Sequence, residues 1–335
     1  MNKKWFLLAV VAAMMAVLVA ACGGQAPTPA PAEEKEEAAA PAEEQASGDK
    51  MTIKLAENPW SGSQVNVAVA KILLEQELGY PVEIVAIDEN AQWSALASGD
   101  LSASLEVWPS GHADNVALYI DEQKSVENAG ALGPAGEIGW FMPAYALDHD
   151  ASLATWEGFA KPEAAEYFAT AETGDKGQFL AGDQSWTQYD EDIIKNLGMD
   201  FEVVYAGSED ALMAALDSAY SRDEPVVFYF WTPHSAFAKY DLVQVELPEY
   251  SDECYAKADS GGVDCAYPAD ELFKIVSAKL KDEAPDADKL LRNFNYTTED
   301  QISMIAAVEL DGKSPEEAAK AWVAENEATW KAWLQ

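Results

Sequence analysis

The chain has 335 residues, of which 49% are hydrophobic, and its formal net charge is −38. This length exceeds what one hydrophobic core usually supports, so we expect two packed units. The charge excludes nucleic acid and anionic lipid headgroups as electrostatic partners, because both would repel this surface. A solvated acidic surface that keeps the protein soluble explains this charge better than a role in attracting a ligand does. A cationic partner is compatible with it.

The first 50 residues predict export and a lipid anchor. A basic start over residues 1–4 precedes an apolar run over 5–20, which is the layout of a secretory signal and is too short for a membrane span. Residues 19–23 resemble the bacterial lipobox, so we expect a lipoprotein signal peptide over 1–21 and acylation of Cys22. An ordinary signal with an incidental cysteine is the alternative. Residues 22–50 are rich in Ala, Pro and Glu, which predicts a disordered tether.

From residue 51 onward, strand and helix patterns alternate, which is typical of an α/β fold. After Pro268 we expect the chain to be helical, and Ser314 with the proline that follows it marks a helix start. Residues 135–146 predict an extended segment that carries the chain from a first lobe into a second. The other expected strands are 52–56, 82–87, 101–107, 178–181, 201–205, 225–230 and 240–247, and the expected helices are 64–78, 90–98, 156–169, 189–197, 208–221, 285–294, 299–310 and 314–326.

Several tryptophans lie where strands end. Trp60 falls in the first strand-to-helix loop, and Trp108 and Trp231 each end a strand that a proline stops. Ligands of open α/β sheets collect beyond the carboxyl ends of strands, so we expect these indole rings to face one cleft. Trp140 lies in the extended segment, where core packing is the alternative, and Trp186 lies in a further strand-to-helix loop.

The sequence lacks the motifs of the common hydrolases and nucleotide-binding enzymes, and it has only three histidines. No Cys/His cluster with metal-ligand spacing appears, so we expect no metal and no cofactor. In an exported protein Cys254 and Cys265 suggest a disulfide, and two reduced thiols are the alternative. Indole faces are good partners for quaternary ammonium groups, so a binding function is favoured over catalysis. A lipid-anchored hydrolase that uses cleft carboxylates and His112, and a structural lipoprotein with its tryptophans in the core, are the alternatives.

Four segments of the chain carry a family resemblance, namely residues 96–100, 106–109, 230–234 and 315–333. Together they resemble the substrate-binding proteins of ABC transporters for glycine betaine, proline betaine and choline. The resemblance implies an α/β fold of two lobes joined by a two-strand hinge, which is the type II clamshell of periplasmic binding proteins. It places lobe 1 at 51–143 and 235–335, and lobe 2 at 144–234.

The same resemblance assigns roles to individual residues. It implies an aromatic cage, for which we rank four tryptophans above Trp186: Trp60, Trp108, Trp140 and Trp231. His234 resembles a histidine that meets the ligand carboxylate in some members, with backbone N–H groups near Ser61 and Gly62 as further donors. A histidine that caps the strand end is the alternative. No arginine obviously serves that carboxylate, which leaves the identity of the ligand open.

We therefore predict a monomeric extracytoplasmic lipoprotein that is not an enzyme. It would capture a quaternary ammonium osmolyte, with glycine betaine first and choline or proline betaine next. It would then deliver this ligand to a membrane permease with a cytoplasmic ATPase.

Overall fold

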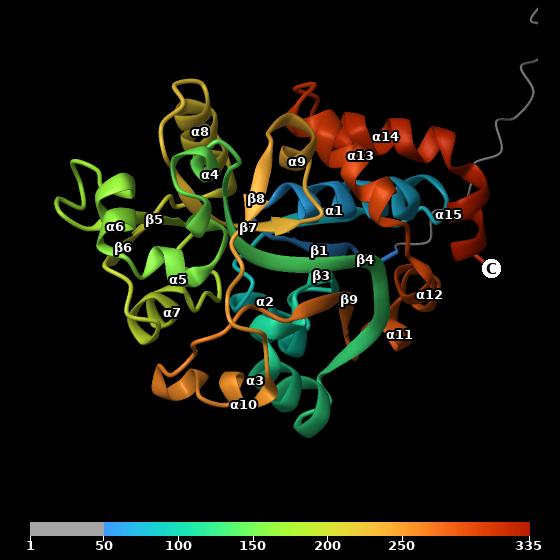
Figure 1. Ribbon diagram of the computed structural model, residues 1–335. Coiled ribbons are helices and arrows are strands. Elements are labelled where there is room, and N and C mark those ends of the chain that lie inside the picture. The colour runs from blue at the N-terminus through green and yellow to red at the C-terminus, as the bar shows by residue number, and fades with distance from the viewer. Residues whose placement is uncertain (1–49) are drawn as a thin grey trace, which may run out of the picture. The chain divides into compact units, whose positions relative to one another are not determined.

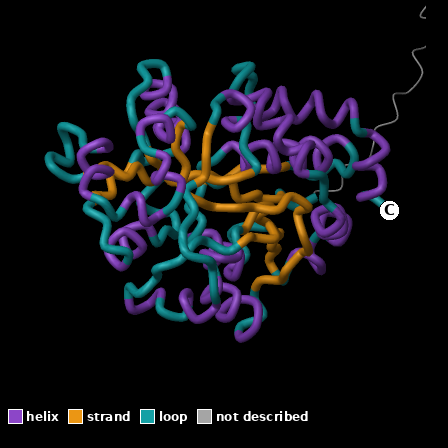
Figure 2. The backbone as a smooth tube through the Cα atoms, in the orientation of Figure 1, coloured by secondary structure: helices purple, strands orange, loops and turns teal. Residues whose placement is uncertain are grey.

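The structure is a computed structural model, and it describes residues 50–335. The expected signal peptide, Cys22 and nearly all of the tether lie outside the described residues. One open sheet runs through the described part, in the order β2-β1-β3-β9-β4-β7-β5-β6, with β8 added on β4 (Figure 1, Figure 2). The strands are β1 Ile53–Glu57, β2 Val82–Ala86, β3 Ala103–Val107, β4 Val126–Pro143, β5 Gly177–Ala181, β6 Phe201–Tyr205, β7 Val227–Thr232, β8 Leu242–Gln244 and β9 Ala269–Ser277.

The long strand β4 joins two parallel regions of this sheet. Strands β1, β2 and β3 are parallel to one another, as are β5, β6 and β7. The first part of β4 pairs with β9 and its later part pairs with β7, both antiparallel. Glu137 is the residue where these pairings meet, opposite Ala269 on one side and Thr232 on the other. The chain therefore passes from one region to the other within a single strand (Figure 1).

Helices follow most strands, and their starts carry the signals expected from the sequence. Thr297 and Ser314 each form a capping box with the residue three positions later, which satisfies free N–H groups at the starts of α13 and α14. Within residues 50–335 no helix has the length and apolarity needed to cross a membrane. The α-helices are α1 Ser61–Gln76, α2 Ala91–Ser98, α3 Ala113–Asn115, α4 Ala146–His149, α5 Trp156–Phe159, α6 Pro162–Phe168, α7 Asp190–Asn196, α8 Glu209–Tyr220, α9 Ala236–Lys239, α10 Asp252–Tyr255, α11 Leu280–Glu283, α12 Pro285–Asn293, α13 Thr298–Glu309, α14 Pro315–Glu325 and α15 Glu327–Trp333.

Two large hydrophobic cores form on the two regions of the sheet. The first packs α1 and the C-terminal helices on β1 and β3, and Leu73 and Phe294 are fully buried in it. The second surrounds β5 and β7 and includes Phe179 and Phe228. Burial of each such side chain stabilises the fold by roughly 1.5 to 3 kcal/mol. Side chains between 236 and 267 belong to the second core, and the lobe boundaries given above stay a prediction.

Two elements differ from the pattern expected. Residues 269–277 were expected to begin a helical region, but they form β9, which lies between β3 and β4 near the middle of the sheet. Most side chains on both faces of β9 are buried, so the strand lacks the alternation that would have identified it. The helix expected over 156–169 is divided into α5 and α6, because Pro162 begins α6 and has no N–H to continue the preceding helix.

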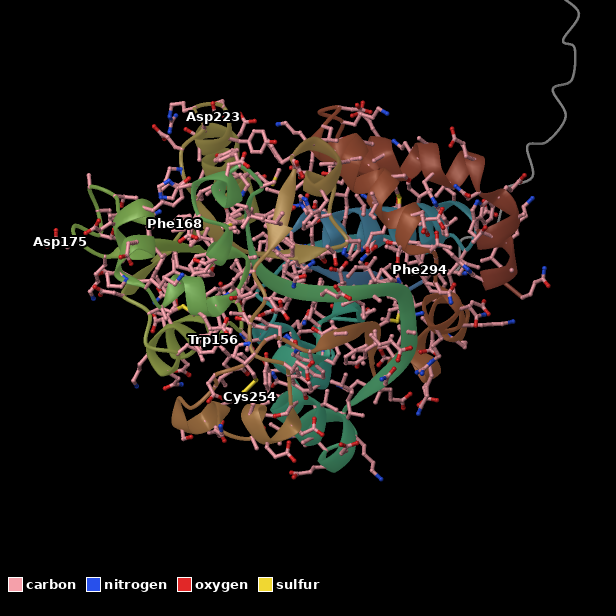
Figure 3. All side chains as sticks on the ribbon, in the orientation of Figure 1. Trp156, Phe168, Asp175, Asp223, Cys254 and Phe294 are labelled. Atoms are coloured by element: carbon pink, nitrogen blue, oxygen red, sulfur yellow. A yellow bond between two sulfur atoms is a disulfide. The ribbon has the colours of Figure 1, made fainter. Side chains whose placement is uncertain are left out.

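The described chain contains a disulfide between Cys254 and Cys265 (Figure 3). It joins Cys254, which lies in α10, to Cys265 in the chain that follows, and both cysteines are buried against the second core. Replacing both by alanine should lower the free energy of unfolding by about 3 kcal/mol, because the unfolded chain then loses a cross-link. Urea unfolding of the oxidised protein and of the double variant measures this. Equal midpoints for the two proteins would contradict it, and the reduced protein should behave like the variant.

Candidate functional site

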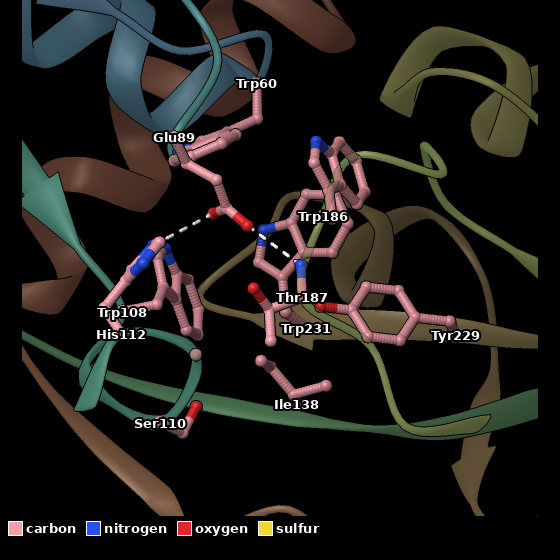
Figure 4. Close-up of a pocket in the computed structure, with 11 residues that line it drawn as sticks. Trp60, Glu89, Trp108, Ser110, His112, Ile138, Trp186, Thr187, Tyr229 and Trp231 are labelled. Atoms are coloured by element: carbon pink, nitrogen blue, oxygen red, sulfur yellow. Dashed lines mark hydrogen bonds and ion pairs between the residues drawn. The ribbon is translucent and has the colours of Figure 1, made fainter. Parts of the chain in front are cut away.

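A pocket lies at the carboxyl ends of strands from both parallel regions of the sheet, β1 and β3 in one and β5 and β7 in the other. Trp60 precedes α1 and comes shortly after β1, Trp108 follows β3, Trp186 lies in the loop after β5, and Trp231 lies near the end of β7. This is the edge where open α/β sheets bind ligands. The lining residues, most of which Figure 4 labels, are Trp60, Glu89, Trp108, Ser110, Gly111, His112, Ile138, Trp186, Thr187, Tyr229 and Trp231.

The aromatic rings of this pocket stand at steep angles to one another. Trp186 lies edge-on to Trp60, with ring centroids 6.2 Å apart and planes at 89°, and to Trp231, at 5.3 Å and 85°. Its ring is also 6.2 Å from that of Tyr229. Rings so arranged form walls rather than a stack, and several faces can then contact one small cation. We call Trp60, Trp108, Trp186, Tyr229 and Trp231 the aromatic cage.

Two glycines make room for the cage rings. A Cβ atom on Gly182 would lie 2.3 Å from the ring of Trp186, and one on Gly136 would lie 2.3 Å from the ring of Trp108. No side chain could stand at either position without moving the indole. The absence of a Cβ at these positions therefore fixes where the rings can pack.

One buried carboxylate orients two of the cage tryptophans. Oε1 of Glu106 accepts hydrogen bonds from the indole Nε1–H groups of Trp60, at 2.8 Å, and Trp108, at 3.1 Å. Oε2 accepts from the amides of Asn66, at 2.6 Å, and Gln301, at 2.8 Å. Burial raises the pKa of Glu106, and these four hydrogen bonds oppose that rise. Both indoles are thereby held by their N–H edges, which leaves their electron-rich faces free.

Sequence reasoning did not single out Glu106, although it lies in a segment that carries the family resemblance. A signal for it exists in the pattern. Side chains two residues apart on a strand point to the same side, so an acid two positions before Trp108 is placed to reach the indole N–H.

Polar groups close one side of the pocket. Oε1 of Glu89 accepts from the backbone N–H of Thr187 at 2.9 Å, and Oε2 lies 3.5 Å from Nε2 of His112 (Figure 4). Ser110 donates through its backbone N–H and its hydroxyl to Asp270. Among the described residues, no lysine or arginine lines this pocket.

His234, Ser61 and Gly62 lie next to the cage but do not line it. Nε2 of His234 is 2.7 Å from Oε1 of Glu209, and its ring is 5.7 Å from that of Trp231. Ser61 donates its backbone N–H and its hydroxyl to the same carboxylate, at 2.7 and 2.6 Å. Gly62 lets α1 approach Glu106, since a Cβ there would lie 2.8 Å from the carboxylate.

Trp140 does not line the pocket, and the structure brings Trp186 there instead. Trp140 is opposite Tyr229 in the sheet, and Ile138 is opposite Trp231, so all four side chains point to the same face. Depth along the strand does not exclude Trp140, because Tyr229 lies opposite it and lines the pocket. The ring of Trp140 instead lies 4.5 Å from that of Phe179, and it is 1% exposed in the second core. Trp140 thus lies where the alternative of core packing placed it, and Trp186 lines the pocket.

A family comparison matches most of the described chain. Residues 51–325 match the model of the substrate-binding domain of the ABC-type glycine betaine transport system. The chain belongs to this family. Its members are extracytoplasmic solute-binding proteins and not enzymes, so the hydrolase alternative is wrong and the expected family is confirmed.

Individual relatives and structures agree with this membership. The chain is 28% identical to a trimethylamine N-oxide-binding protein of Pelagibacter ubique over 85% of its own length and 91% of the relative. It is 34% identical to a glycine betaine/carnitine transport binding protein of Listeria monocytogenes, over 35% of this chain and 34% of that one. The fold matches lactococcal OpuAC in its closed, glycine betaine-bound form at 23% identity, with a TM-score of 0.67 over 86% of this chain and all of the other. It matches a choline-bound binding protein at 22% identity, with a TM-score of 0.68 over 84% and 91% of the two chains. The α/β type II clamshell expected from the sequence is thus confirmed.

Replacing Glu106 by Gln tests whether this carboxylate organises the site. The amide would present N–H donors to those of Asn66 and Gln301, so we expect a loss of about 1 to 3 kcal/mol in the free energy of unfolding. Glu309→Gln, a half-buried acid on α13 that makes no such bonds, is the matched control. Urea unfolding followed by tryptophan fluorescence measures both. A Glu106 variant as stable as the control would show that the hydrogen bonds are not needed.

The free energy of unfolding should depend on pH through the titration of Asp190. Burial raises its pKa from 3.8 to about 7, against hydrogen bonds from Trp140 and Tyr267. Between these values the folded protein keeps a proton that the unfolded chain has lost. Stability from this group should therefore be full below pH 4 and fall as the pH rises to 7, by about 1.4 kcal/mol per pKa unit. Unfolding of wild type and Asp190→Asn from pH 4 to 8 checks this: the difference between their free energies of unfolding should change with pH if Asp190 titrates in this range, and a constant difference would contradict the prediction.

Proposed function

We propose that this chain is a lipid-anchored solute-binding protein that captures the methylated ammonium group of an osmolyte in the aromatic cage. The observation that carries the proposal is the set of steeply angled rings around one pocket, with Trp186 between Trp60 and Trp231. A quaternary ammonium group has no N–H to donate and is weakly hydrated, so indole faces suit it better than hydrogen-bond acceptors do. The names of the relatives support this chemistry, because each refers to a methylated amine compound.

The expected affinity follows from the number of faces. Each ring can contribute roughly 0.5 to 2 kcal/mol, depending on how far the cation is desolvated. Four or five faces would then give about micromolar binding once the ordering of ligand and protein is subtracted. Closure of the two lobes around the ligand would exclude water and place the contacts at the upper end of this range.

The anchor and the partners complete the proposal. Acylation of Cys22 would hold the protein on the outer side of the cell membrane, and residues 22–50 would let the binding lobes reach the permease. The permease and its ATPase would then take the released osmolyte inward. Glycine betaine ranks first by resemblance to the family, with choline and proline betaine next.

Isothermal titration with glycine betaine, proline betaine, choline and trimethylamine N-oxide tests the cage. Trp186→Ala should raise the dissociation constant of every ligand that binds by about tenfold or more. The bound cation then loses contact with one ring face and is more exposed to water. Trp156→Ala is the matched control, because Trp156 packs on the second core and does not line the pocket. Circular dichroism should show both variants folded.

A titration with an uncharged ligand separates binding of a cation in the cage from general apolar binding. The neutral carbon isostere of choline should bind more weakly than choline, because an uncharged group gains nothing from the electrostatic attraction of a ring face. If none of the four osmolytes binds at sub-millimolar concentration, the cage proposal is wrong.

A further inference from the structure

We propose that the ligand of the cage is a methylated ammonium compound without a carboxylate, because the chain supplies its own carboxylates around the site. This inference rests on the proposed function and goes beyond it by naming the class of ligand. It changes the order expected from resemblance, in which glycine betaine came first. The groups that carry it are Glu209 and Glu89.

The donors expected to bind a ligand carboxylate already bind Glu209. The backbone N–H and the hydroxyl of Ser61 both donate to this side chain, at 2.7 and 2.6 Å. Nδ1 of His234 accepts from the backbone N–H of Ala236 at 3.0 Å, so the ring proton resides on Nε2. Nε2–H then donates to Oε1 of Glu209 at 2.7 Å. The ring N–H of His234 and both donors of Ser61 are therefore already bound to Glu209.

The position of Glu209 explains why a carboxylate is stable there. Ser61 is the first residue of α1, and Glu209 is the first residue of α8, so the carboxylate lies at the N-termini of two helices. Free N–H groups and the helix dipole favour negative charge at such positions. Glu209 is 3% exposed and its bonds are satisfied within the protein. A carboxylate of the chain itself therefore binds the donors of Ser61 and His234 beside the cage, which leaves them no longer available to a ligand carboxylate.

Inside the pocket the remaining charge has the wrong sign for a carboxylate ligand. Glu89 lines the pocket and is 7% exposed, and its Oε2 lies 3.5 Å from Nε2 of His112. No lysine or arginine of the described residues lines the pocket to offset a second carboxylate. A ligand carboxylate would be repelled by Glu89, whereas a cation with a hydroxyl tail would be attracted. Glu89 and Glu209 thus both favour a ligand without a carboxylate.

Choline and glycine betaine form a matched pair for testing this selection. They share the trimethylammonium group, and choline has a hydroxymethyl group where glycine betaine has a carboxylate. Isothermal titration of the full-length chain should give a dissociation constant for choline at least about tenfold below that for glycine betaine. Because both ligands make the same cage contacts, the ratio of their dissociation constants depends only on the hydroxymethyl or carboxylate group.

Three variants assign the selection to the two carboxylates. Glu209→Gln and Glu89→Gln should each reduce the ratio of the two dissociation constants, glycine betaine over choline, by about fivefold. Each variant removes one negative charge that would repel the ligand carboxylate. Glu309→Gln is the control for a general loss of negative charge. Burial, and then repulsion from Glu209, raise the pKa of Glu309, which indicates that the two carboxyl groups are near each other. Glu309 does not bond to Ser61 or His234. The control should leave the ratio unchanged. Thermal melting checks folding, and if Glu209→Gln does not fold, Glu89→Gln decides.

The outcomes are distinguishable. Glycine betaine binding as tightly as choline to the wild type would overturn this inference and leave the cage intact. A ratio that neither Glu209→Gln nor Glu89→Gln changes would also overturn it. If neither choline nor glycine betaine binds, the proposed function fails, and this inference falls with it.

Discussion

The site depends on one buried carboxylate that accepts hydrogen bonds from two indole rings. Glu106 is 2% exposed, and transferring its charge from water would be costly if its oxygens were unpaired. Two indole N–H groups and two amides satisfy it, and these donors come from the residue after β3, the residue before α1, α1 itself and α13. The free energy that keeps the acid buried therefore also keeps Trp60 and Trp108 in place. A cage held this way is preorganised, so binding does not have to order these rings.

Acidic groups around the cage repeat the same arrangement with different partners. Glu89 accepts the backbone N–H of Thr187, and Glu209 accepts that of Ser61, so each joins segments far apart in the sequence. Each also lies beside a histidine, His112 or His234. Negative charge near the site is consistent with a cationic ligand, and it comes from groups that hold the fold together rather than from the acidic surface.

The sequence predicted the class of the fold well because strand and helix alternation is a local signal. It failed for β9, since a central strand buried on both faces has no alternation. The site was harder, because membership of the cage depends on tertiary packing. Trp140 and Ile138 share a face of β4, but Ile138 lines the pocket whereas Trp140 packs on Phe179 in the core. Trp186 lies in a loop, and Glu209 reaches Ser61 across 148 residues; neither position follows from local patterns.

The cage walls come from both regions of the sheet, which links binding to the arrangement of the lobes. Trp60 and Trp108 follow β1 and β3, whereas Trp186 and Trp231 belong to β5 and β7. A ligand can shift a conformational equilibrium only by contacts that differ between the two states. A cation that touches rings from both regions gains most when they are close together, and a ligand held by one wall alone gains nothing from closure. The edge-on contact between Trp186 and Trp60, with ring centroids 6.2 Å apart, is where the two regions of the sheet meet in the wall of the pocket.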